Sequence, residues 1–164
     1  MKKAISILLL VFIAAGIFAG CQKRIYTEKE REEFISREEA SISEQRAEES
    51  KKAENIEVDK ANLEKSIGKS EKNKQLFVKF EYGDHMEYHL VKFKGGKAES
   101  LTKYLYFDND KFYNDIKKGG DDGSSKLIES DDSIRCLVYK DKDILPSTYE
   151  NAYKRYEKQD CTIL

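Results

Sequence analysis

The sequence contains no tryptophan, a single proline and only three cysteines among its 164 residues. Three cysteines are too few for a scaffold held together mainly by disulfides, and the one proline, Pro146, leaves room for long helices. The charges nearly cancel, because 30 basic residues face 31 acidic ones. The chain therefore lacks the basic field that nucleic-acid binding requires, and we expect no nucleic-acid partner.

Motifs of common enzymes are also missing. The sequence has no serine-centred nucleophile elbow, no glycine-rich phosphate loop and no zinc-binding motif. An EF-hand loop starting at Asp108 fails, because Phe112 and Tyr113 occupy the positions that need a ligand and a glycine. We therefore predict no cofactor, no metal and no catalytic residue, and we leave open whether the protein is an enzyme.

The only long uncharged run lies at the start of the chain. It comprises 17 residues, Ala4 to Gly20, and follows Lys2 and Lys3. A short basic segment, an apolar segment and small residues before a break are typical of an export signal. Removing residues 1–20 changes the formal net charge from −1 to −3, so the mature chain is only weakly acidic.

The end of this run resembles the lipobox of bacterial lipoproteins, because Ala19-Gly20-Cys21 places small residues before a cysteine. In that family the cysteine carries a thioether-linked diacylglyceryl group and becomes the first residue of the mature protein. Phe18 stands where the family usually has leucine. The resemblance implies a signal peptide at 1–20 and lipidation of Cys21. It also implies that the protein is anchored to the cell membrane or outer membrane, facing the periplasm or the cell exterior.

A strongly charged segment follows, in which 27 of the 52 residues from Lys23 to Lys74 are charged. Good helix formers dominate it, and Thr27 with Glu30 has the spacing of a helix capping box. A heptad phase runs through Ile35, Ile42, Glu49, Ile56 and Leu63, but its companion positions are polar: Glu38, Gln45, Lys52 and Asp59. A coiled coil needs both positions apolar. We therefore interpret residues 21–74 as a solvated helical or partly disordered spacer that contributes little to the fold.

The aromatic residues mark where a core can form, since nine of ten tyrosines and five of eight phenylalanines lie in residues 75–164. Alternating apolar residues predict strands, and capping residues predict helices. We expect strands at 76–82, 85–94, 101–107, 126–129 and 133–140, and helices at 111–118 and 147–159. This β-β-β-α-β-β-α order predicts an α+β domain with a small, mostly antiparallel sheet and two helices.

His85 and His89 are the only histidines, and on a strand they share one face with Glu87. A two-histidine metal site is conceivable. Two half-exposed histidines on a solvent-facing strand are much commoner, and we expect that arrangement here.

Cys136 and Cys161 remain once Cys21 is acylated, and export takes them to an oxidising compartment. We therefore expect a disulfide between them. The alternative is that Cys136 is a buried apolar residue and that Cys161 is a free thiol in the tail.

A group of aspartates comes next to the first predicted helix of the domain: Asp108, Asp110, Asp115, Asp121 and Asp122. We interpret them as helix caps and loop residues. Our first hypothesis is a lipid-anchored envelope protein with a non-enzymatic binding or structural domain, whose partner is an envelope protein or peptidoglycan. The alternatives are an envelope hydrolase that uses these aspartates and an immunity or inhibitor lipoprotein that neutralises a toxin.

Overall fold

The computed structural model describes residues 27–121, 123–142 and 147–164, which belong to two units. The first unit ends at Gln45, and the second runs from Arg46 to Leu164. The predicted signal peptide and the predicted lipidation site, Cys21, lie outside the described residues. Within the described ranges, no helix combines the length and apolar character needed to cross a membrane.

Helix α2 (Glu28–Ile67) begins with the predicted capping box. The Thr27 backbone N–H donates to the Glu30 carboxylate at 2.8 Å, and the Glu30 N–H donates to the Thr27 hydroxyl at 3.4 Å. Gly68, with φ of 75°, follows the last residue and adopts a left-handed conformation that suits glycine. Residues 27–45 are exposed throughout, so this part of the charged segment is a solvated helix.

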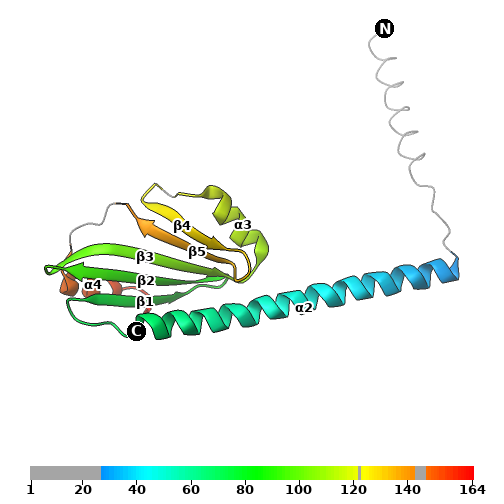
Figure 1. Cartoon of the computed structure of the whole chain (residues 1–164), viewed down its shortest axis with the longest axis horizontal. Helices are drawn as coiled ribbons and strands as arrows, with labels where there is room; N and C mark the ends of the chain where they lie inside the picture. The colour runs from blue at the N-terminus through cyan, green and yellow to red at the C-terminus, as the bar shows by residue number, and fades with distance from the viewer. Residues whose placement is uncertain (1–26, 122, 143–146) are drawn as a thin grey trace, which may run out of the picture. The chain divides into compact units, whose positions relative to one another are not determined.

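Within the described residues, six strands form one sheet in the order β4-β5-β3-β2-β1-β6 (Figure 1). They are β1 (Gln75–Glu81), β2 (His85–Lys94), β3 (Lys97–Phe107), β4 (Ser125–Asp131), β5 (Cys136–Asp141) and β6 (Thr162–Ile163). All neighbouring strands are antiparallel. The predicted α+β class is therefore confirmed, and the short strand β6 extends the predicted element order.

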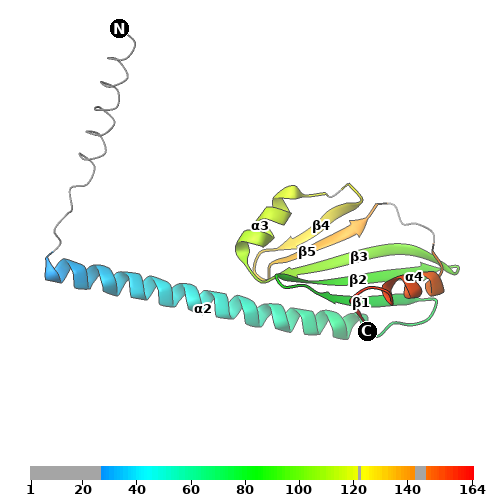
Figure 2. The ribbon, with the colours of Figure 1, turned by 180° about the vertical axis from the view of Figure 1, so that it is seen from behind.

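Two short helices pack on the same face of this sheet. Helix α3 (Asp110–Gly119) begins after Asn109, whose side chain accepts the Phe112 N–H at 2.8 Å. Helix α4 (Tyr149–Tyr156) has Thr148 as its N-cap, so it starts two residues later and ends three residues earlier than the helix predicted at 147–159. Figures 1 and 2 show α4 beside β1 and β2 and α3 beside β5 and β4. Their apolar contacts on the sheet are Leu76, Val78, Phe80, Val91 and Phe93 for α4, and Phe107, Leu137 and Tyr139 for α3.

The opposite face of the sheet is covered by the second half of α2. Ile56 is only 5% exposed and packs in one cluster with Phe77, Tyr88 and Tyr106. Leu63 and Ile67 pack against the same cluster. Residues 46–67 therefore belong to the same unit as the sheet, and Ile56 contributes to its core. The predictions that the whole segment 21–74 is a spacer and that the domain begins at Gln75 are wrong for these residues.

Polar residues of α2 also contact the sheet instead of water. The Tyr106 hydroxyl donates to Asp59 at 2.6 Å, and the Tyr88 hydroxyl donates to Glu64 at 2.7 Å. Burial, together with these hydrogen bonds, raises the pKa of both tyrosines. Asp59 stands at a polar companion position of the heptad, which argues against a coiled coil, and it accepts a hydrogen bond from Tyr106 of the distant strand β3.

Arg135 ties α2 to the turn between β4 and β5 and to the start of α3. It is 1% exposed and has a left-handed φ of 47°. Its guanidinium donates to Asp110 at 2.6 Å, to the Asp108 carbonyl at 3.1 Å and to Glu49 of α2. One buried side chain therefore joins three segments that are far apart in the sequence.

The predicted disulfide is wrong, because Cys136 and Cys161 are free thiols on opposite faces of the sheet. Cys136 begins β5, whereas Cys161 precedes β6, and three strands separate β5 from β6. At about 4.8 Å per strand, the gap far exceeds the reach of a disulfide. Cys136 is a core residue, and burial raises the pKa of its thiol to about 12.

Candidate functional site

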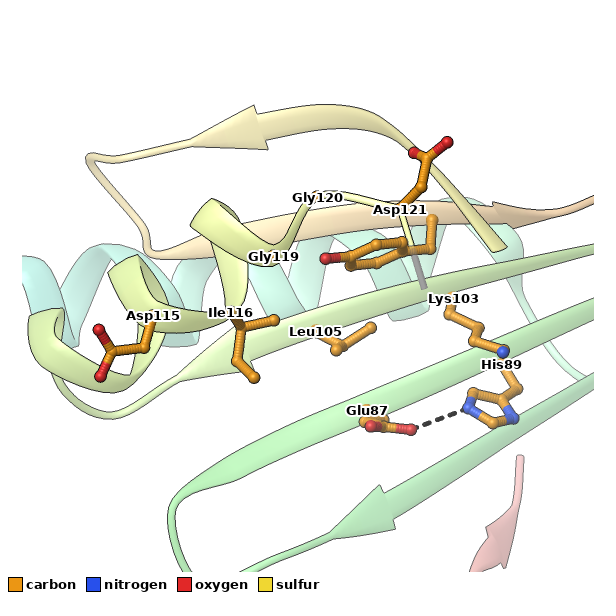
Figure 3. Close-up of a pocket in the computed structure, with 10 residues that line it drawn as sticks. Glu87, His89, Lys103, Leu105, Asp115, Ile116, Gly119, Gly120 and Asp121 are labelled. Carbon is orange, nitrogen blue, oxygen red and sulfur yellow. Dashed lines mark hydrogen bonds and ion pairs between the residues drawn. The ribbon is translucent and has the colours of Figure 1, made fainter. Parts of the chain in front are cut away.

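A pocket of about 470 Å³ opens on the face of the sheet that carries α3 and α4 (Figure 3). Its floor comes from β2, β3 and β5, and its wall from the end of α3 and the residue after Gly120. The floor residues are Glu87, His89, Lys103, Leu105 and Tyr139, and the wall residues are Asp115, Ile116, Gly119, Gly120 and Asp121.

Strand register brings the floor residues together. His89 is directly opposite Lys103, and Lys103 is directly opposite Tyr139 on the next strand. Glu87 is opposite Leu105 in the adjacent row. Cross-strand partners of this kind share one face of a sheet, so residues up to 52 positions apart line one surface. The sequence pattern alone relates only Glu87 to His89.

Glu87 lies between the two histidines and interacts with both. Its carboxylate oxygens are 3.2 Å from His85 Nε2 and 3.0 Å from His89 Nε2. The other ring nitrogens also have partners, since His85 Nδ1 is 2.7 Å from Asp84 and His89 Nδ1 is 3.2 Å from the Tyr156 hydroxyl. A continuous polar chain therefore runs along β2 and ends on helix α4.

Burial and hydrogen bonding act on Glu87 in opposite directions. Burial raises the pKa of its carboxyl, but hydrogen bonds and charge interactions with His89 and His85 outweigh that effect and lower the pKa overall. Glu87 is therefore an ionised acceptor at neutral pH, and its geometry is set before any ligand arrives.

The histidines are more enclosed than predicted. Their side chains are only 16% and 14% exposed, for His85 and His89 respectively, instead of half-exposed. Aromatic rings account for the difference: Tyr82 and Phe107 stack on His85, and Phe80 and Tyr156 contact His89. Both Nε2 atoms are directed at Glu87, and no group of three or more potential ligands in the described part of the chain is arranged to hold a metal ion.

Lys103 is held in place by partners outside the pocket wall. Its ammonium lies 3.0 Å from Asp141 and 3.1 Å from the Ser125 hydroxyl. The Ser125 hydroxyl in turn donates to Asp141 at 2.6 Å. An ammonium has three donors, so these two contacts orient Lys103 and leave one donor for a ligand or water.

The predicted aspartate group is divided by the fold. Asp110 binds Arg135 and Lys52, and the hydrogen bond from Arg135 lowers the pKa of its carboxyl. Asp115 and Asp121 line the pocket, and Asp121 also pairs with Lys142 at 3.0 Å. Asp108 accepts from Arg135 only through its backbone carbonyl, and Asp122 lies outside the described residues. These aspartates thus hold the fold together or border the pocket.

No protein-family model matches this chain, and no curated protein or solved structure is significantly similar to it.

Proposed function

We propose that this chain is a lipid-anchored protein of the bacterial cell envelope whose C-terminal unit binds a ligand without chemically changing it. The anchor is Cys21, in the cell membrane or outer membrane, and the partner is an envelope protein or peptidoglycan that presents the bound group. Support for the anchor comes from the resemblance of Ala19-Gly20-Cys21 to a lipobox. Support for binding comes from the pocket of about 470 Å³, a volume within the usual range for small-molecule sites.

The polar side chains of the pocket are already held in place by neighbouring residues, which favours binding over catalysis. Glu87 is held by two histidines, and Lys103 is held by Asp141 and Ser125. A general acid at neutral pH needs a raised carboxyl pKa, whereas the pKa of Glu87 is lowered. Groups that are already oriented bind a ligand at a low entropic cost, which is the property of a receptor site.

Replacing Cys21 by alanine is expected to move the protein from the membrane fraction to the soluble or precursor fraction, because alanine has no thiol to form the thioether. The measurement is fractionation of cells labelled with a clickable fatty-acid analogue. Cys161→Ala is the matched control and should keep both label and membrane retention. Equal retention of the Cys21→Ala and unchanged chains, with label in neither, would contradict lipid anchoring.

Filling the pocket is expected to remove ligand binding without unfolding the protein. Gly119 lines the pocket, and a Cβ added there meets no atom within 4 Å, so Gly119→Trp adds a ring without a backbone clash. Gly83→Trp adds the same ring at a second open glycine that does not line the pocket. Native mass spectrometry of the mature chain with an envelope extract and with muropeptides should show a bound mass.

We expect to observe that bound mass with the unchanged chain and with Gly83→Trp. We expect it to be absent with Gly119→Trp. A bound mass that survives equally in Gly119→Trp would place binding elsewhere. No bound mass with any chain would refute the proposed binding function.

A further inference from the structure

The charges around the pocket are unbalanced. Glu87, Asp115 and Asp121 line it, and Asp141 lies against Lys103. These four carboxylates are matched by three ammonium groups, because Lys103 and Lys142 are in ion pairs and the charge of Lys126 also lowers the pKa of Asp121. With the histidines left out of the count, the balance is one negative charge. Charges in a cleft of low dielectric act together on a ligand, even where they do not touch it.

The carbonyls at the end of helix α3 add partial negative charge near the pocket, which the two basic residues of its last turn, Lys117 and Lys118, partly offset. Ile116, Gly119 and Gly120 line the pocket, and they lie in the last turn of α3 and at its C-cap. A helix C-terminus carries a partial negative charge on carbonyls that have no partner within the helix. The Gly120 N–H caps the Lys117 carbonyl, and the Lys117 side chain is engaged by Asp132. The Lys117 ammonium group is therefore paired with the Asp132 carboxylate, and neither residue lines the pocket.

An apolar surface separates the charged parts of the pocket. Figure 3 shows Ile116 and Leu105 between Asp115 on one side and Glu87, His89 and Lys103 on the other. Tyr139 adds a buried aromatic ring to this surface. An apolar part of a ligand can be covered here while a charged group reaches the polar end.

We infer that the pocket binds a small organic cation, namely a primary amine attached to an apolar body. The ligand's ammonium group would donate a hydrogen bond to Glu87, because the carboxylate has lone pairs beyond those used by the histidines. A carboxylate ligand would gain only the remaining donor of Lys103 and would face the net negative charge. This inference rests on the proposed binding function and assigns its ligand class.

The test uses three probes of similar size that differ in charge: 2-phenylethylamine, 2-phenylethanol and phenylacetate. Calorimetry on the mature chain should give about tenfold tighter binding of the amine than of the alcohol, and weaker binding of the carboxylate than of either. Raising the salt concentration should weaken the amine alone, because screening acts on charge. Amide resonances of Gly119 and Gly120 should shift with the amine, and Gly119→Trp should abolish its binding.

Reversing the charge of an exposed residue that lines the pocket tests whether negative charge attracts the amine, without disturbing the core. Asp115 is exposed, so Asp115→Lys should leave the thermal midpoint nearly unchanged. We expect it to weaken amine binding about fivefold more than it weakens alcohol binding. Asp160→Lys makes the same charge change at an exposed position that does not line the pocket, and should alter amine affinity by less than about twofold.

The outcomes separate this inference from the proposed function. Equal affinity for the three probes, or tighter binding of phenylacetate, overturns the amine assignment while pocket binding stands. If none of the probes binds, but Gly119→Trp still removes an envelope ligand, the amine assignment fails and the binding function survives. If neither probes nor extract bind, both fail.

Discussion

Removing residues 1–74 is expected to abolish cooperative folding of the sheet, whereas removing residues 1–45 is expected to leave the fold intact. The reason is the second half of α2, which covers Phe77, Tyr88 and Tyr106. A buried aromatic side chain removes roughly 150–250 Å² from water, at about 25 cal/mol per Å². Exposing three such rings would cost an amount comparable to the entire stability of a small domain, about 5–15 kcal/mol.

Near-ultraviolet circular dichroism and guanidinium unfolding of the two shortened chains test this expectation. The chain that begins at Arg46 should keep a sharp transition, and the chain that begins at Gln75 should show none. A single substitution gives a milder version in the full chain. Ile56→Ala should lower the free energy of unfolding by about 2–4 kcal/mol, because it leaves a cavity in the core.

Ile42→Ala is the matched control, since Ile42 is 47% exposed on the same helix and its loss should cost less than about 0.5 kcal/mol. A cooperative transition in the chain that begins at Gln75 would show that the sheet is stable without α2. It would restore the domain boundary predicted from composition.

Replacing Arg135 by methionine is expected to lower the free energy of unfolding by about 2–3 kcal/mol. Methionine keeps much of the apolar volume but loses the bonds to Asp110, Glu49 and the Asp108 carbonyl. We place the effect below that of a fully buried ion pair, because the side chains of Asp110 and Glu49 are about half exposed and water can solvate them. Chemical unfolding at neutral pH measures the difference.

The pH dependence of this difference identifies its electrostatic part. Hydrogen bonding from Arg135 lowers the folded-state pKa of Asp110. A lowered carboxyl pKa stabilises the folded state fully above the unfolded value of about 3.9, and this contribution is lost as the pH falls through the lower folded-state pKa. The gap between the unchanged chain and Arg135→Met should therefore shrink below about pH 4.

Arg155→Met is the control for this experiment, because Arg155 is an exposed residue of α4. It should change the free energy of unfolding by less than about 0.5 kcal/mol at any of these pH values. If Arg135→Met lowers the free energy of unfolding no more than Arg155→Met does, the contacts of Arg135 with α2 and α3 contribute little to stability.

Local signals in the sequence predict most elements of the fold. The Thr27–Glu30 capping box starts α2 where expected, and alternating residues place β1 and β2 within a residue or two of their observed bounds. The aspartate and asparagine residues before Lys111 include Asn109, the N-cap of α3. These features arise from neighbours a few positions apart, so a single sequence contains all the information that they need.

Contacts between distant segments account for the predictions that fail. The polar residues of α2 look like those of a solvated helix, and only the fold reveals that Asp59 and Glu64 have tyrosine partners on β3 and β2. Cys136 and Cys161 suggest a disulfide by number and compartment. Strand order, however, places three strands between β5 and β6.

The sequence by itself determined the α+β class, the positions of the core strands and the capping box at Thr27, because periodicity and capping depend on nearby residues. Only the tertiary structure decided that half of that helix is a layer of the core and that His89, Lys103 and Tyr139 meet in one pocket. Strand register and helix docking decide these points, and both depend on pairings between residues far apart in the chain.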